Sequence, residues 1–331
     1  MRKTATTNTL YYGDNLAILR DYIEDESVDL IYLDPPFNSN ATYNVLFKTP
    51  GGGGRDNGGQ SQAQIEAFED TWHWGESAAL AFDEVMQSGN TDAAEMLRAM
   101  RSFLNDNDMM AYLTMMAVRL LELHRVLKPT GSLYLHCDPT ASHYLKLLLD
   151  AIFGKERFLN EIIWQRTNAH NFKSRSFPRV HDVIFFYAKS SEHKFKQAYV
   201  DFSPQQLARY EVEEETGRLF TGQDMTIING DLSPWRGTTP NAPRGWGLSL
   251  EEREKLWKAG LVLNRKDGTP RLDGRKVYLD EKDGVSVSDL WMDISRIANT
   301  SGERLGYPTQ KPLALLERVL DLPYFFGPRL A

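Results

Sequence analysis

One ten-residue stretch, Val28–Phe37, constrains the fold of this chain more than any other. It begins as a short apolar run rich in β-branched and aromatic side chains, which is typical of a strand buried on both faces of a parallel sheet. Pro35 and Pro36 end this strand because proline cannot donate a ladder hydrogen bond. Since Asp34 precedes a proline, its backbone is held extended. The stretch therefore predicts a carboxylate, two carbonyls and the Phe37 ring at the carboxyl end of a strand, where open α/β sheets bind ligands.

A strand end of this kind can hold the exocyclic amine of a nucleobase, which has two hydrogens to donate. Asp34 supplies a carboxylate oxygen and the Pro35 carbonyl supplies a second acceptor. Stacking on Phe37 at roughly 1–3 kcal/mol and two hydrogen bonds at roughly 0.5–1.5 kcal/mol each offset the cost of extracting a base from a duplex. The four residues are interpreted as a site for a flipped base, and a plain Pro-Pro strand end is the alternative.

Asp34-Pro35-Pro36-Phe37 resembles the catalytic motif of the DNA amino-methyltransferases, which use S-adenosylmethionine. The resemblance implies that these four residues are catalytic. Aspartate in the first position is more similar to the adenine-modifying members than to the cytosine-modifying ones, which usually carry serine there. The resemblance covers nearly all of residues 10–320.

Two further segments resemble the cofactor-binding parts of this family. Gly13-Asp14 lies twenty residues before Asp34, at the place of a pair that lies beside the adenosine of the cofactor. Asp14 could equally cap the helix that follows it. Residues 307–313 resemble the segment that cradles the methionine end, and a helix beginning at Pro312 would suit the cofactor's carboxylate. The residues implied to bind S-adenosylmethionine are Asp14, Asp34, Thr309 and Lys311.

The rest of the chain alternates between helical and strand patterns. Apolar residues recur at helical spacing over 108–127, and 128–131 is expected to be the turn that ends this helix. Further strands are expected at 132–138, 161–164 and 182–187, with a helix at 141–153. The alternation predicts an α/β fold with a doubly wound, Rossmann-like sheet. The expected organisation is a catalytic core over 10–190, a target-recognition insertion over 191–286, a return to the core with the cofactor segment over 287–322, and an atypical tail over 323–331.

Basic residues are concentrated between Arg166 and Lys196, where seven Lys and Arg side chains stand against two acids. Aromatic and asparagine residues are interleaved with them, as expected where a protein touches a nucleic-acid backbone and bases, although a solvated hairpin is the alternative. Two more arginines neighbour tryptophans on turn-rich loops. The residues expected to bind DNA are Lys173, Arg175, Arg179, Arg236 and Arg244.

Composition bounds the class of protein. A net charge of −7 argues against a general nucleic-acid coating protein, but not against an enzyme with a locally basic cleft. The one cysteine excludes a disulfide framework and a cysteine-cluster zinc site. No apolar run is long enough to span a membrane and no signal peptide is evident, so a cytoplasmic protein without a membrane partner is expected.

The resemblance ends near Leu320. Family members with this motif order continue into a strand with a Phe-x-Gly-x-Gly-type loop, whereas the residues here contain one glycine and two prolines. Truncation, a shifted reading frame and a partner that supplies the missing half are all open. The sheet is therefore expected to be incomplete, with residues 28–34 at an exposed edge that a partner chain or a second copy could complete.

The resemblance implies a site-specific DNA methyltransferase of a restriction-modification system, acting on the amine of an adenine flipped out of double-stranded DNA. The transfer would be direct and in line, without a covalent intermediate or a metal. The alternatives are a non-catalytic or partner-dependent DNA-binding remnant, and a methyltransferase that acts on RNA or on a protein amide.

Overall fold

The computed structural model describes residues 8–36, 42–46, 64–69, 72–169, 175–298, 300–305 and 309–321, with only the backbone of 42–46 and 64–69. It divides into two compact units, Met1–Ala198 with Val287–Ala331, and Tyr199–Ser286. Phe37, Lys173 and the tail 323–331 lie outside the described residues. The second unit and the predicted insertion both end at residue 286, but the unit begins at Tyr199, eight residues after the predicted start at 191. The role of this unit in target recognition stays a prediction.

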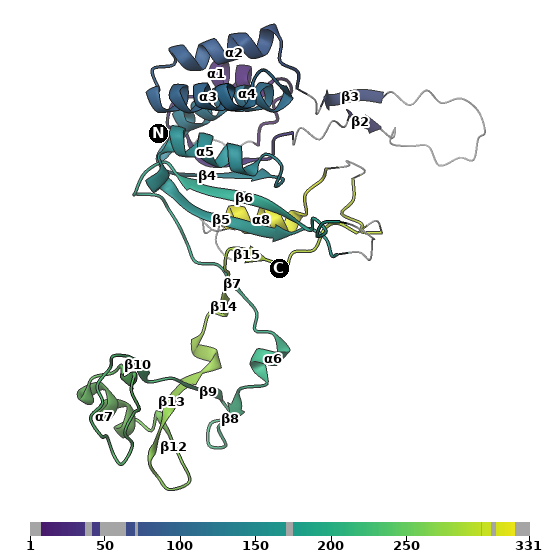
Figure 1. Cartoon of the computed structure of the whole chain (residues 1–331). Coiled ribbons are helices and arrows are strands. Elements are labelled where there is room, and N and C mark those ends of the chain that lie inside the picture. Colours follow the sequence, from purple (N-terminus) through teal and green to yellow (C-terminus); the bar gives the residue numbers. More distant parts are fainter. Residues whose placement is uncertain are drawn as a thin grey trace, which may run out of the picture. The chain divides into compact units, whose positions relative to one another are not determined.

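The first unit is built on a five-stranded sheet in the order β1-β4-β6-β5-β15 (Figure 1). Parallel pairs at the two ends, β1 with β4 and β5 with β15, flank the antiparallel pairs of β6, so the sheet is mixed. The strands are β1 (Val28–Leu33), β4 (Leu127–Cys137), β5 (Phe158–Gln165), β6 (His181–Ala188) and β15 (Leu290–Trp291).

Helices cover both faces of this sheet, which confirms the doubly wound α/β fold (Figure 1). Alternate residues of β4 show the two layers, because Leu133 belongs to one apolar cluster and Tyr134 to the other. The Leu133 cluster packs under α2–α5, and the Tyr134 cluster packs under α8. The helices of this unit are α1 (Asn15–Tyr22), α2 (Glu76–Gln87), α3 (Thr91–Leu104), α4 (Asp108–Val126), α5 (Ser142–Phe153) and α8 (Leu313–Asp321).

Strand β1 lies at an edge, as expected: among the described strands it pairs only with β4. Its predicted burial on both faces is wrong, because Ile31 is its one buried residue and the rest of the strand is half-buried. An edge strand has a sheet neighbour on one side only, so fewer side chains cover it.

The turn predicted at 128–131 is also wrong in form, since these residues are part of β4. They form an irregular segment of the strand, because Val28 pairs with Leu127 and Leu30 with Ser132, so four residues of β4 lie opposite Asp29 alone. Gly131 is required in this segment, since a Cβ added to it would lie 2.8 Å from the carbonyl oxygen of Asp29.

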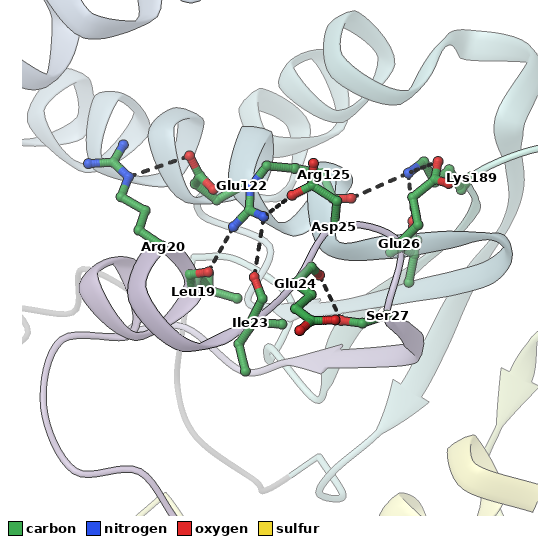
Figure 2. A network of polar contacts seen from close by, with 11 residues as sticks. Leu19, Arg20, Ile23, Glu24, Asp25, Glu26, Ser27, Glu122, Arg125 and Lys189 are labelled. Atoms are coloured by element: carbon green, nitrogen blue, oxygen red, sulfur yellow. Dashed lines mark hydrogen bonds and ion pairs between the residues drawn. The ribbon is translucent and has the colours of Figure 1, made fainter. Parts of the chain in front are cut away.

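A polar network anchors the amino end of β1 to the helical layer (Figure 2). Arg125 of α4 donates to the carbonyl of Leu19 at 2.7 Å and to that of Ile23 at 3.3 Å, and it binds the carboxylate of Asp25. Lys189, just after β6, donates to Glu26 at 3.3 Å. The end of α1 and the loop before β1 are therefore held through two backbone carbonyls and two carboxylates, which fixes where the strand starts and hence where its carboxyl end lies.

The second unit combines short strands around a small core of Met225, Trp235, Trp246 and Val262. Its four-stranded antiparallel sheet has the order β12-β13-β9-β8, and two further pairs are β10 with β11 and β7 with β14. Its elements are β7 (Tyr199–Val200), α6 (Pro204–Leu207), β8 (Glu211–Val212), β9 (Leu219–Gln223), β10 (Thr226–Ile228), β11 (Arg244–Trp246), α7 (Leu250–Lys258), β12 (Val262–Asn264), β13 (Pro270–Tyr278) and β14 (Val285–Ser286).

The remaining pair, β2 (Thr42–Leu46) and β3 (Gln64–Glu69), is antiparallel. Within the described ranges, no helix is long and apolar enough to cross a membrane.

Candidate active site at the carboxyl end of β1

An ion pair between Asp34 and Lys311 forms the centre of the candidate site. Lys311 Nζ donates to Asp34 Oδ1 at 2.7 Å and to Oδ2 at 2.8 Å. The Lys311 side chain is 10% exposed and that of Asp34 is 30% exposed, so the pair faces solvent mainly through the carboxylate. Lys311 Nζ also lies 3.4 Å from the carbonyl oxygen of Thr309. Three of the four predicted cofactor residues are therefore in one place.

The backbone on both sides of this pair is held by prolines. Pro35 is buried and Pro36 half-buried directly after β1, so the Asp34 carboxylate is presented at a firmly packed strand end. Pro312 is buried immediately before α8. The amide of Leu313, at the start of α8, is already bound by the Glu303 carboxylate. That amide is therefore not free to bind a cofactor carboxylate, which argues against the expectation that the start of α8 binds this group.

Asp14 is held by two other groups. Its Oδ1 accepts a hydrogen bond from the Leu16 amide at 2.9 Å, so the interpretation of Asp14 as a helix cap is confirmed. Arg119 of α4 binds both oxygens of the same carboxylate, at 2.7 and 2.9 Å. The structure does not bring Asp14 into contact with Asp34, and its role toward the cofactor stays a prediction.

A series of polar contacts, buried at His136 and Asp182, runs across the sheet beside this site. The Tyr32 hydroxyl lies 2.6 Å from His136 Nδ1, and His136 Nε2 lies 3.1 Å from Asp182 Oδ2. Asp182 Oδ1 in turn lies 2.9 Å from Nε of Arg166, which follows β5. These residues come from the neighbouring strands β1, β4 and β6 and from the segment after β5. All lie toward the end of the sheet where β1, β4 and β5 terminate and β6 begins, which is also where Asp34 lies.

This series of contacts was not identified from the sequence. The signal was a polar residue near the end of each of three otherwise apolar strands. His136 is fully buried and Asp182 is nearly so. Polar groups buried to this degree require partners, which could have suggested that they meet.

Burial determines which of these polar groups carry a proton. Burial and the Lys311 ammonium both lower the pKa of His136, and these two effects outweigh the opposite effect of the nearby carboxylates. The imidazole is then neutral, so Nε2–H donates to Asp182 and Nδ1 accepts from the Tyr32 hydroxyl. Burial, followed by the charges of Asp34 and Asp182, raises the pKa of Tyr32 far above its ordinary value. Tyr32 therefore keeps its proton at any physiological pH.

The predicted DNA contacts fall into two groups. Arg175 and Arg179 are exposed in the segment before β6, and within the described part of the chain neither forms an ion pair. Arg236 binds Glu254 at 2.7 Å and lies over the Trp257 ring at 4.5 Å. Arg244 binds Asp224 at 2.7 Å. The two arginines of the second unit thus already hold carboxylates, while a role in DNA binding stays a prediction for all of these residues.

Comparison of the sequence with known proteins identifies a family. The sequence profile N6_N4_Mtase, described as "DNA methylase", matches residues 28–323, which include both Asp34 and Lys311. The Type II methyltransferase M.EcaI of Enterobacter cloacae is 25% identical over 318 residues, 95% of this chain and 58% of that protein. The StyLTI Mod subunit, a Type III restriction-modification enzyme of Salmonella typhimurium, is 24% identical over 336 residues, 95% of this chain and 46% of that protein.

Among solved structures, the cytosine-N4-specific PvuII DNA methyltransferase overlaps 56% of this chain and 50% of its own, at 14% identity and a TM-score of 0.31. The family assignment rests on the sequence profile. The chain spans about half the length of the curated relatives that it matches. Since the profile covers most of the chain, this protein belongs to the N6_N4_Mtase family of DNA methylases.

Proposed function

We propose that this protein transfers a methyl group from S-adenosylmethionine to the exocyclic amine of an adenine flipped out of duplex DNA. The observation that carries the proposal is the Asp34–Lys311 pair at the carboxyl end of β1, directly before the Pro35 carbonyl. A carboxylate has about four lone-pair sites, so Asp34 can accept from the amine of a base while it also accepts from Lys311.

The acceptors at this strand end make the amine more nucleophilic. Conjugation with the ring flattens the amine and withdraws its lone pair. Hydrogen bonds to Asp34 and to the Pro35 carbonyl favour the pyramidal nitrogen of the transition state, where binding must be strongest. In the transfer an N–CH₃ bond would form as the S–CH₃ bond breaks, the sulfur would leave as a neutral thioether, and the proton lost by the amine nitrogen would pass to the Asp34 carboxylate or to solvent water. No covalent enzyme intermediate is needed.

The charges of the site suit the proposed cofactor. The methionine end of S-adenosylmethionine carries one carboxylate and one ammonium, and the site presents one ammonium and one carboxylate, on Lys311 and Asp34. Thr309 lies beside them and can add its hydroxyl. When bound, S-adenosylmethionine supplies an electrophilic methyl group. The residues proposed to hold it are Asp34, Thr309 and Lys311, with Asp14 as a more distant candidate.

We also infer that the open edge of β1 can accept a partner strand, either from a second copy or from another chain. This inference is supported by the position of β1 in the sheet, where β4 is its one described neighbour.

Methyl transfer from labelled S-adenosylmethionine tests the proposed function. The full chain is incubated separately with duplex DNA, RNA and protein, and the digested products are identified by mass spectrometry. N6-methyladenine in DNA, absent with Asp34→Ala, is the expected result. N4-methylcytosine would change the target base, and label in RNA or protein would change the substrate class. DNA binding without any transfer would favour the non-catalytic remnant.

A further inference from the structure

A second polar pocket opens at the end of β5, and the series of polar contacts through His136 and Asp182 lies between it and Asp34. It has a volume of about 150 Å³, and its lining includes Arg166, Thr167, Asn168, Ser295 and Arg296. Two of the lining residues are arginines and none is a carboxylate. Arg296 is exposed and forms no ion pair with any described residue. The pocket is therefore positively charged and rich in hydrogen-bond donors.

The donors of this pocket are fixed by the protein. Arg166 forms an ion pair with Asp182, whose side chain is 5% exposed, while the Arg166 side chain is 45% exposed. A guanidinium has five N–H donors, so an ion pair through Nε keeps Arg166 at this place and leaves its Nη groups for a ligand. The backbone amides of Arg166 and Thr167 both donate to the Val180 carbonyl, at 3.0 and 3.2 Å, which ties the segment to the start of β6.

Asn168 is also held by a neighbouring side chain. Gln165 Nε2 donates to Asn168 Oδ1 at 3.1 Å, which uses one of the two lone pairs of this oxygen. The N–H groups of the Asn168 amide can donate to a ligand. Donors from Arg166, Asn168 and Arg296 around one small cavity match an anion with several acceptor oxygens, and the forked guanidinium suits the oxygens of a phosphate.

We infer that this pocket binds a backbone phosphate of the nucleic acid close to the target nucleotide. Three strand spacings of about 4.7–4.9 Å separate β5 from β1, so the pocket lies roughly 14 Å from the strand that carries Asp34. The pocket and Asp34 lie at the same end of the sheet, where β1 and β5 terminate. The inference rests on the proposed function, because it takes a nucleic acid held at Asp34 as the source of the phosphate.

Salt-dependent DNA binding tests this site in the full chain. The variants are Arg296→Ala, Arg296→Lys and, as a matched control, Arg98→Ala, which removes an exposed arginine of α3 on the other sheet face. Affinity for one synthetic duplex is measured by fluorescence anisotropy at several salt concentrations. Arg296→Ala should reduce the slope of log affinity against log salt by about 0.9, the value for one phosphate that the protein no longer neutralises. Arg296→Lys should keep most of the slope, and Arg98→Ala should match the parent.

A slope for Arg296→Ala equal to that of the parent would overturn the phosphate site. Inorganic phosphate provides a second readout, since it should raise the melting temperature of the parent more than that of Arg296→Ala, and equal shifts would count against the site. Methylation by the parent separates the two proposals. Transfer to DNA with an unchanged Arg296→Ala slope keeps the proposed function and removes the pocket, whereas a reduced slope without transfer keeps the pocket and removes the function.

Discussion

Lys311 and Asp34 stand 277 positions apart in the chain, yet one ammonium donates to both oxygens of the other residue's carboxylate. Lys311 is the more buried partner, at 10% exposure. Its charge therefore depends on Asp34 for compensation, and this ties the segment before α8 to the end of β1. Lys311, which the family resemblance implies to be a cofactor residue, and Asp34, which it implies to be catalytic, are therefore directly bonded to one another.

We expect Asp34→Ala to abolish methylation while the overall fold and DNA affinity stay nearly intact, although the protein should lose some stability because Lys311 is left without its counter-charge. The Asp34 side chain lies at a strand end outside the core, and removing a group that stabilises the transition state typically costs about 10²-fold or more in rate. Initial rates and circular dichroism would be measured side by side. Asp34→Asn keeps the shape and removes the charge, so it should fail in the same way. A rate above about a tenth of the parent's would exclude Asp34 as the amine acceptor.

Lys311→Met should raise KM for S-adenosylmethionine more than it lowers kcat, because the ammonium is proposed to hold the cofactor. The matched control is Lys128→Met, which breaks a pair of similar length at the other end of β1, where Lys128 Nζ lies 2.6 Å from Asp29 Oδ2. Steady-state kinetics with varied cofactor would distinguish the two variants. Equal effects would indicate that Lys311 acts only through the stability of the sheet.

Changing Lys173, Arg175 and Arg179 together to alanine should weaken DNA binding about equally on unrelated sequences. If these side chains bind phosphates, the slope of log affinity against log salt should shrink by up to about 0.9 for each of the three cations removed. Anisotropy titrations over a salt series would measure this. An unchanged slope would mean that these cations are simply solvated.

Stability should fall on mild acidification because His136 is buried and neutral. Its pKa in the folded protein lies below the ordinary value of about 6.5, which the unfolded chain retains. The unfolded state therefore binds more protons below about pH 6.5, and the free energy of unfolding decreases from there down to the folded pKa. Tyr32, Asp182, Lys311 and Asp34 are the groups that face this imidazole.

His136→Gln is the variant that isolates this effect. Its amide can accept from Tyr32 and donate to Asp182 without titrating. Urea unfolding of parent and variant between about pH 5 and 8 should show a difference that changes with pH below about 6.5. His124, whose pKa is also lowered by burial, contributes equally to both proteins. A constant difference across this range would contradict a buried, neutral His136.

Features that depend on neighbours in the chain were predictable from the sequence alone. Two prolines end β1 wherever the strand is placed, and Asn107 and Leu127 bound the long helix α4 close to the predicted residues. The doubly wound α/β fold also follows from local apolar periodicity. The motif at Asp34 indicated the family only together with Gly13-Asp14 and residues 307–313, because a strand that ends in two prolines is ordinary structure on its own.

Only the tertiary structure decided which distant groups meet. The Asp34–Lys311 pair and the chain from Tyr32 through His136 and Asp182 to Arg166 join residues of separate elements. Strand order and direction bring them together, and an apolar strand pattern is the same whichever neighbour the strand pairs with. For the same reason, the sequence misjudged the burial of β1: how many side chains cover a strand depends on its place in the sheet, which its own residues do not encode.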